Sequence, residues 1–266
     1  MESVLQFTPS SFETSHFEPP SRWLMLAEAR ALYEAGAALA LWPLLQLTPR
    51  GDGHAVLVLP GLGAGDRSTE LMRRYLNSRG HDAHGWGLGQ NLGPRDGVEA
   101  RLLRRLRALY AASGHKKVSL VGWSLGGVFA RMMASLQPDL VRSVVTLGTP
   151  FIGSPRATRA WQVYEKVSGQ PAEDAARRQL VSPTPPVPTT SIFSRSDGVV
   201  SWRCSVERPG AAAENIEVLA SHFGLGAHPA VLYALADRLA QQPEEWRPFD
   251  RSRLGAWVYP DPARLQ

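Results

Sequence analysis

Val121-Gly122-Trp123-Ser124-Leu125-Gly126-Gly127 joins a predicted buried strand at 117–121 to a segment at 125–137 whose spacing predicts a helix. A serine between two glycines at a strand-to-helix junction forms the G-x-S-x-G elbow, in which the serine projects above the edge of a sheet. The turn is so sharp that side chains at Gly122 and Gly126 would collide with neighbouring backbone, so glycine is needed there. The pattern predicts that Ser124 is a nucleophile.

Apolar runs alternate with helical patterns on both sides of this elbow. Short runs predict strands at 55–60, 82–86, 141–147, 189–194 and 216–219, and helical spacing occurs at 71–78, 98–110 and 229–241. This alternation predicts an α/β fold with a mostly parallel central sheet of about six strands and helices on both faces. The connection at 149–188 is too long for a simple loop, so we expect a small helical cap, inserted at about 152–187, with helices at 156–167 and 172–180.

The first part of the chain differs from the rest. Residues 1–50 predict a loose arm followed by a helix packed on the main domain, and that domain occupies 51–266. Ser21 can cap a helix that runs to about Trp42, where Pro43 ends it. An alternative is a membrane-surface helix over residues 21–45, but its polar face is poor in Lys and Arg. We therefore favour packing against the main domain.

Composition excludes several classes of protein. The chain has 266 residues, a net charge of +5 and a hydrophobic fraction of 44%, which is typical of a globular protein. Cys204 has no partner within the chain, and the longest apolar run, 35–45, is too short to span a bilayer. The arginine cluster at 101–107 lies on an amphipathic helix without any nucleic-acid motif, so we expect no nucleic-acid partner. The N-terminus lacks a secretory pattern, which predicts a cytoplasmic protein, peripherally membrane-associated under the alternative above. Oligomeric state stays open.

A nucleophilic serine needs a base and a carboxylate, and each must lie at the carboxyl end of a strand. His222 follows the last predicted strand, whereas its competitor His228 adjoins Pro229 at the start of a helix. Asp197 follows the next-to-last strand and completes the chain order Ser–Asp–His. Asp139 follows a helix and Glu217 lies within a strand, so neither fits as well.

The loop after the first strand, Pro60-Gly61-Leu62-Gly63-Ala64-Gly65, is a candidate anion site. Its glycines do not match a phosphate-binding pattern, and no G-K-[ST] follows. We expect the backbone N–H of Leu62 to form an oxyanion hole together with that of Leu125. His81 and His84 are spaced to lie on opposite faces of a strand, so a shared metal site is not expected, and the predicted chemistry needs no cofactor.

Taken together, these motifs resemble the α/β-hydrolase superfamily, and more narrowly its compact bacterial esterase and lipase members, over residues 54–241. Leu147-Gly148-Thr149-Pro150, the Asp197 loop and Ser221-His222-Phe223-Gly224 belong to the same resemblance. The resemblance implies Ser124 as nucleophile, Asp197 as acid and His222 as base. The chain departs from it by carrying Pro60-Gly61 where many relatives have His-Gly, and by lacking the usual antiparallel first strands.

These features predict a serine hydrolase that cleaves small-molecule or lipid esters through an acyl-enzyme intermediate. An acyltransferase or thioesterase, or a hydrolase of C–C bonds, would use the same residues, and a non-enzymatic scaffold is the remaining alternative. Aromatic side chains near the catalytic loops are expected to line the substrate pocket, with core packing as the competing interpretation: Trp123, Phe151, Trp161, Trp202 and Phe223.

Overall fold

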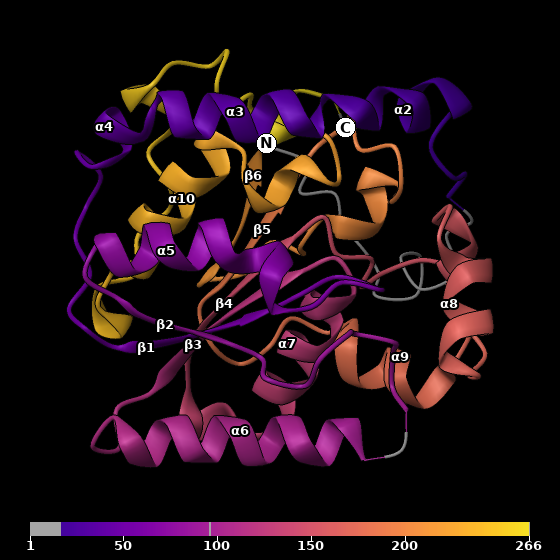
Figure 1. Ribbon diagram of the computed structural model, residues 1–266, viewed down its shortest axis with the longest axis horizontal. Helices are drawn as coiled ribbons and strands as arrows, with labels where there is room; N and C mark the ends of the chain where they lie inside the picture. The colour runs from indigo at the N-terminus through magenta and orange to yellow at the C-terminus, as the bar shows by residue number, and fades with distance from the viewer. Residues whose placement is uncertain (1–16, 96, 266) are drawn as a thin grey trace, which may run out of the picture.

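A computed structural model of the chain describes residues 17–95 and 97–265 and has a parallel sheet at its centre (Figure 1). Six strands pair in the order β2-β1-β3-β4-β5-β6, and every pairing is parallel. They are β1 (Ala55–Leu59), β2 (Asp82–Gly85), β3 (Val118–Trp123), β4 (Val141–Leu147), β5 (Thr189–Phe193) and β6 (Ala213–Glu217). The predicted fold class and the expected number of strands are confirmed.

Helices cover both faces of the sheet because successive strand residues point to opposite sides. Val56 and Val58 belong to a core beneath α3, α5 and α10, whereas Leu57 and Leu59 belong to a second core beneath α6 and α7 (Figure 1). The bounds of these helices are α3 (Ala31–Ala40), α5 (Glu70–Ser78), α6 (Val98–Ala112), α7 (Leu125–Leu136) and α10 (Pro229–Leu239). Strands buried on both faces explain the unbroken apolar runs in the sequence.

The long connection between β4 and β5 contains two helices, α8 (Trp161–Ser168) and α9 (Ala175–Val181). The helix predicted from residue 156 begins only at Trp161, because Pro155 starts a short 3-10 turn and Thr158 pairs with Val200 in an isolated bridge. The end of α9 is fixed to α7, since Arg131 Nε donates to the Val181 carbonyl at 2.6 Å.

The segment before the sheet is helical and lies along one edge of the molecule (Figure 1). It consists of α2 (Arg22–Ala27), a 3-10 turn η1 (Glu28–Arg30), α3 and α4 (Trp42–Leu45). Ser21 caps α2, and Ala38 and Leu45 are buried in the core that also contains α5 and α10. The helix ends close to the expected place, because α3 stops at Ala40 with Leu41 as its C-cap. Pro43 itself lies in the first turn of the short helix α4, where its missing N–H costs nothing. Within 17–95 and 97–265, no helix is long and apolar enough to cross a bilayer.

The last strand, β6, starts three residues earlier than its apolar run predicts. It lies at an edge of the sheet, and its first three residues, 213–215, are only half-buried. Asn215 instead exchanges hydrogen bonds with the backbone of Glu207, accepting at 2.7 Å and donating at 2.8 Å. Polar residues that pair in this way leave no hydrophobic signal in the sequence.

Candidate active site

The strand order reverses at β1, which has β2 on one side and β3 on the other. In open α/β sheets, ligands bind at the carboxyl ends of the strands close to such a switch point. The loops that leave this edge carry Leu62 after β1, Ser124 after β3, Asp197 after β5 and His222 after β6. The sheet thus brings together loops that are far apart in the sequence.

Ser124 occupies the predicted turn between β3 and α7. Its φ of 53° and ψ of −120° are uncommon for a residue with a side chain, and its N–H donates to the Leu147 carbonyl at 2.8 Å. A Cβ at Gly122 would lie 2.3 Å from the Gly127 Cα, and one at Gly126 would lie 2.3 Å from the Leu59 carbonyl oxygen. The strained backbone is therefore held by close packing that only glycine permits.

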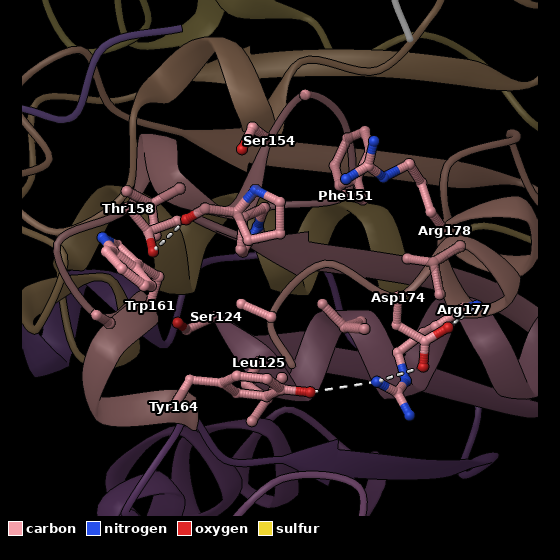
Figure 2. A pocket seen from close by; sticks show the side chains of 18 of the residues that line it. Ser124, Leu125, Phe151, Ser154, Thr158, Trp161, Tyr164, Asp174, Arg177 and Arg178 are labelled. Carbon is pink, nitrogen blue, oxygen red and sulfur yellow. Dashed lines mark hydrogen bonds and ion pairs between the residues drawn. The ribbon is translucent and has the colours of Figure 1, made fainter. Parts of the chain in front are cut away.

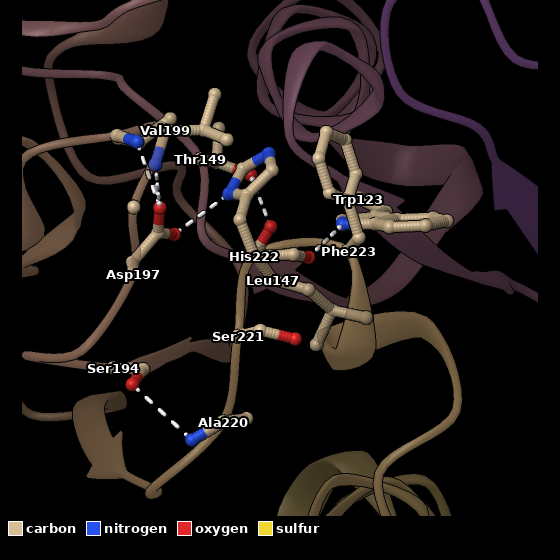
Figure 3. Close-up of polar contacts among 12 residues, drawn as sticks. Trp123, Leu147, Thr149, Ser194, Asp197, Val199, Ala220, Ser221, His222 and Phe223 are labelled. Atoms are coloured by element: carbon tan, nitrogen blue, oxygen red, sulfur yellow. Dashed lines mark hydrogen bonds and ion pairs between the residues drawn. The ribbon is translucent and has the colours of Figure 1, made fainter. Parts of the chain in front are cut away.

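Asp197 and His222 form a buried pair (Figure 3). Asp197 Oδ2 lies 2.6 Å from His222 Nδ1, while Oδ1 accepts the N–H groups of Val199 and Val200 at 2.8 and 2.7 Å. A carboxylate partner requires a proton on Nδ1, which leaves Nε2 of the neutral ring as a proton acceptor. Burial of the imidazole opposes its charged form, but the charge and hydrogen bond of Asp197 and the charge of Glu28 outweigh it and raise the pKa of His222 above its usual 6.5.

A hydrogen bond and a close approach connect this pair to the elbow and to the end of β4. The indole N–H of Trp123, the residue before Ser124, donates to the His222 carbonyl at 3.0 Å (Figure 3). A Cβ at Gly148, just after β4, would lie 3.0 Å from Asp197 Oδ2 and 3.2 Å from His222 Nδ1. Within 17–95 and 97–265, no hydrogen bond joins Ser124 Oγ to the imidazole; in unliganded enzymes such bonds are often long and tighten with substrate.

The loop after β1 lies against Ser124, since a Cβ at Gly61 would be 3.4 Å from the Ser124 Cβ. Both Leu62 and Leu125 line the same cavity as Ser124. Leu125 is the first residue of α7, so its N–H has no acceptor within the helix. Asn91 pins the loop: its side-chain amide donates to the Pro60 carbonyl, and its backbone carbonyl accepts from Gly63, both at 2.7 Å.

A cavity that is partly open to solvent lies between the elbow and residues 150–181 of the connection between β4 and β5 (Figure 2). Ser124 lies at its base, and its walls are mostly apolar side chains of α7, the β4 loop and the cap, including Val128, Phe151, Trp161 and Val181. One side is polar, because Arg177 of α9 bonds to Tyr164 Oη at 3.2 Å and pairs with Asp174 at 3.2 Å.

The five aromatic residues proposed for the pocket occupy different places. Phe151 and Trp161 line the cavity, whereas Trp123 packs in the core. Trp202 stacks on Phe193, with 5.8 Å between ring centroids, and carries the Arg195 guanidinium 3.8 Å above its ring. Phe223 is half exposed beside the His222 ring.

The competing residues have structural partners. His228 caps α10, where its Nδ1 accepts the Ala230 N–H at 3.2 Å. Glu217 pairs with Arg195 at 3.1 Å. Asp139 lies in the 3-10 turn that leads into β4, at the opposite end of that strand from the Asp197 loop.

The sequence reasoning missed the buried carboxylates Glu28 and Glu34, which contact the loops of Asp197 and His222. A signal was available, because these are the two acidic residues of a helical segment, 22–45, that is mostly apolar. Asn91 was also missed, and no motif marks it.

Comparison with known proteins points to one family. A model described as the alpha/beta hydrolase fold matches residues 52–183, which include the elbow but end before Asp197 and His222. The chain is 34% identical over 110 residues to a triacylglycerol lipase of Pseudarthrobacter phenanthrenivorans, covering 38% of this chain and 34% of the lipase. It is also 34% identical over 110 residues to a triacylglycerol lipase of Burkholderia plantarii, covering 38% and 30%. The match thus spans about a third of the length of these curated relatives.

Among solved structures, lipase B of Aspergillus fumigatus resembles the chain with a TM-score of 0.57 at 18% sequence identity. The likeness covers 76% of this chain and 54% of the lipase. At this identity it concerns the fold.

Proposed function

Because the chain belongs to the α/β-hydrolase superfamily, we propose that it is a serine hydrolase that cleaves carboxylic esters, of the esterase and lipase type. The observation that carries the proposal is the buried Asp197–His222 pair at the sheet edge where the strained Ser124 opens into an apolar cavity. A buried imidazole that is hydrogen-bonded to a carboxylate, at the same sheet edge as the serine, is the arrangement that a general base needs.

In the proposed reaction, Ser124 Oγ attacks the ester carbonyl carbon while His222 Nε2 takes its proton. Asp197 holds the ring in the required tautomer and stabilises the imidazolium. The N–H groups of Leu62 and Leu125 donate to the oxyanion of the tetrahedral intermediate. His222 then protonates the leaving alcohol, and water, deprotonated by the same imidazole, releases the acid from the acyl-enzyme. No step requires a cofactor.

The cavity suggests the acyl side of the substrate. Its apolar walls suit an alkyl or aromatic acyl group, and the relatives described as triacylglycerol lipases support a lipid-like ester. An acyltransferase or thioesterase would use the same catalytic residues, so the acceptor of the acyl group must be tested directly.

The test is a panel of p-nitrophenyl esters with acyl groups from acetyl to palmitoyl, assayed with and without an added alcohol and alongside matched thioesters. We expect saturable turnover with free acid as the main product, and a rate that rises with acyl length until the cavity is filled. Acyl transfer to the alcohol as the dominant outcome, or turnover of thioesters alone, would assign the chain to the alternative. Turnover of no substrate would contradict the proposal.

A further inference from the structure

The N-terminal helices, which lie along one edge of the molecule (Figure 1), expose several large apolar side chains. Trp23, Leu32 and Tyr33 are 80%, 86% and 80% exposed. Four leucines of the same segment are each more than 60% exposed: Leu26, Leu39, Leu44 and Leu47. We call these seven residues the outer face. Isolated exposed leucines are common on proteins, but a group of seven large exposed apolar residues on one segment is typical of an interaction surface.

The polarity of these helices is inverted relative to an ordinary surface helix. Glu28 and Glu34 are only 5% and 6% exposed, so the carboxylates face the protein while the leucines face outward. A helix that faces water normally places its charged residues outside and its apolar stripe inside. The carboxylates thus have partners on the inner side, and the exposed apolar side chains favour an apolar partner on the outer side.

The charges at the ends of the outer face favour a lipid surface as that partner. Within residues 21–50 both carboxylates are buried, and the exposed charged side chains are Arg22 and Arg50. Trp, Tyr and Leu between basic residues suit the boundary between acyl chains and anionic headgroups. If two copies of the chain paired through this face with the same ends together across a two-fold axis, the arginines of one copy would lie against those of the other. Like charges would then repel.

The helices that carry the outer face are also hydrogen-bonded to the loop of His222. Phe223 and Leu219, which flank His222, are 51% and 69% exposed, and Glu28 of η1 accepts the Phe223 N–H at 2.9 Å. We propose that the outer face docks this protein on an anionic lipid surface, with the His222 loop turned toward it. This placement goes beyond the ester hydrolysis proposed above and does not depend on it.

Vesicle co-sedimentation of the Ser124→Ala protein tests the docking without any contribution from activity. We expect binding to phosphatidylglycerol vesicles that exceeds binding to phosphatidylcholine and weakens with salt. The double variant Leu32→Asn, Leu39→Asn should lose at least about tenfold in affinity, since two apolar anchors leave the interface. The matched control is Leu136→Asn with Val163→Asn, exposed apolar residues on α7 and α8, and should bind as before.

Equal binding by the outer-face variant and the parent would overturn the docking proposal, as would failure of the parent to bind any vesicle. Sedimentation velocity without lipid supplies the other outcome. A dimer that dissociates in the outer-face variant would assign this surface to a second copy of the chain and also overturn the proposal.

The inner side of the same helices carries a second, independent observation. Glu28 Oε1 accepts the N–H groups of Gly198 at 2.7 Å and His222 at 2.9 Å, and these residues lie 170 and 194 positions away in sequence. One buried carboxylate thus bridges the loop of the candidate acid and the loop of the candidate base. Charge-assisted hydrogen bonds of this kind offset the cost of burying the carboxylate.

Glu34 and Arg30 extend this bridge. Glu34 Oε1 accepts the Ser221 N–H at 2.9 Å, and Ser221 Oγ donates to Oε2 at 2.5 Å. Arg30 bonds to Glu34 at 3.0 Å and donates to the Ser196 carbonyl at 2.9 Å. The residues immediately before Asp197 and His222 are therefore held by one turn of helix.

The N-terminal helices pack so closely on both loops that a side chain at Gly198 or Gly224 would overlap them. A Cβ at Gly198 would lie 2.3 Å from the Leu24 carbonyl oxygen, and one at Gly224 would lie 1.5 Å from Glu34 Oε2. We infer that Glu28 and Glu34 are positioning residues that set the distance and orientation of Asp197 and His222. This inference rests on the proposed function, because it assigns a role to those two residues.

Glu28 also contributes charge at the imidazole. The charged groups facing the His222 loop are Asp197 from the loop after β5, and Glu28, Arg30 and Glu34 from the N-terminal helices. A general base works in its neutral form, so the acidic limb of kcat/KM follows the pKa of His222. Removing the negative charge of Glu28 lowers that pKa and moves the limb to lower pH.

The test compares Glu28→Gln with Glu28→Asp, which keeps the charge but shortens the reach. We expect Glu28→Gln to lower kcat about ten- to a hundredfold and to move the acidic limb to lower pH, because a charge that raises the pKa of His222 is removed. Glu28→Asp should lower kcat with little movement of the limb. The control Glu214→Gln removes a half-buried carboxylate that accepts the Phe249 N–H at 2.7 Å, away from both loops, and should change neither quantity.

NMR titration of the His222 ring in the Ser124→Ala background measures the change in the His222 pKa that Glu28→Gln causes. Because it needs no assay of activity, it separates failure of this inference from failure of the proposed function. An unchanged His222 pKa in Glu28→Gln, or an unchanged kcat in Glu28→Asp, would overturn the positioning role. If Glu28→Gln does not fold, Glu28→Asp alone carries the test.

Discussion

We expect Ser124→Ala to lower kcat/KM for the best ester by about 10⁶-fold while the fold persists. The loss is large because the substitution removes the atom that forms the acyl-enzyme, and serine hydrolases without their nucleophile keep only binding and oxyanion stabilisation. The fold survives because a Cβ is already present at this position, and the positive φ is held by packing at Gly122 and Gly126. Steady-state kinetics and circular dichroism measure the two parts of the prediction.

A matched control for this variant is Ser154→Ala. Ser154 also lines the cavity, but its hydroxyl donates to Glu173 at 2.8 Å in the cap, and it lies outside the proposed triad. We expect its kcat to stay within a few-fold of the parent. Undiminished turnover in Ser124→Ala would reject Ser124 as the nucleophile.

Asp197→Asn should lower kcat about 10⁴-fold, the second largest effect that the geometry predicts. The amide oxygen can still accept the N–H groups of Val199 and Val200, so the loop keeps its shape. The amide nitrogen, however, would donate to His222 Nδ1, which places the ring proton on Nε2. In that tautomer the imidazole has no lone pair for the serine proton.

The control for Asp197→Asn is Asp139→Asn. Asp139 also lies between Ser124 and His222 in the sequence, so it fits the same chain order. Asp139 lies in the turn before β4, away from the loops at the carboxyl ends of the strands, and its loss should leave kcat unchanged. A near-normal rate in Asp197→Asn would place the acid elsewhere, and a collapse of rate in Asp139→Asn would point to that residue.

The sheet was predictable from sequence because its strands are buried on both faces. The run 55–59 is continuous in apolar residues, and 141–147 is rich in them, so both give strong signals. The elbow was predictable because such a sharp turn leaves no space for a Cβ at Gly122 or Gly126, so the sequence must carry glycine there. The positions of Asp197 and His222 followed from one rule, that loops at the carboxyl ends of parallel strands converge.

The N-terminal helices were not predictable in the same way. Their apolar residues suggested burial, yet many of them face outward, and the residues that fix the helices to the loops are the charged Glu28 and Glu34. Hydrophobic pattern cannot assign such a face, because the partners of the carboxylates are backbone N–H groups 170 or more positions away. The aromatic pocket residues depended likewise on side-chain directions that only packing decides.

The most direct measurement is covalent labelling of the parent protein by a fluorophosphonate, followed by peptide mapping. An activated serine reacts with this probe and an ordinary hydroxyl does not. The expected result is a single adduct on Ser124, formed rapidly in the parent and slowed strongly in His222→Ala. Absence of labelling, or an adduct on another serine that forms equally fast without His222, would contradict the mechanism.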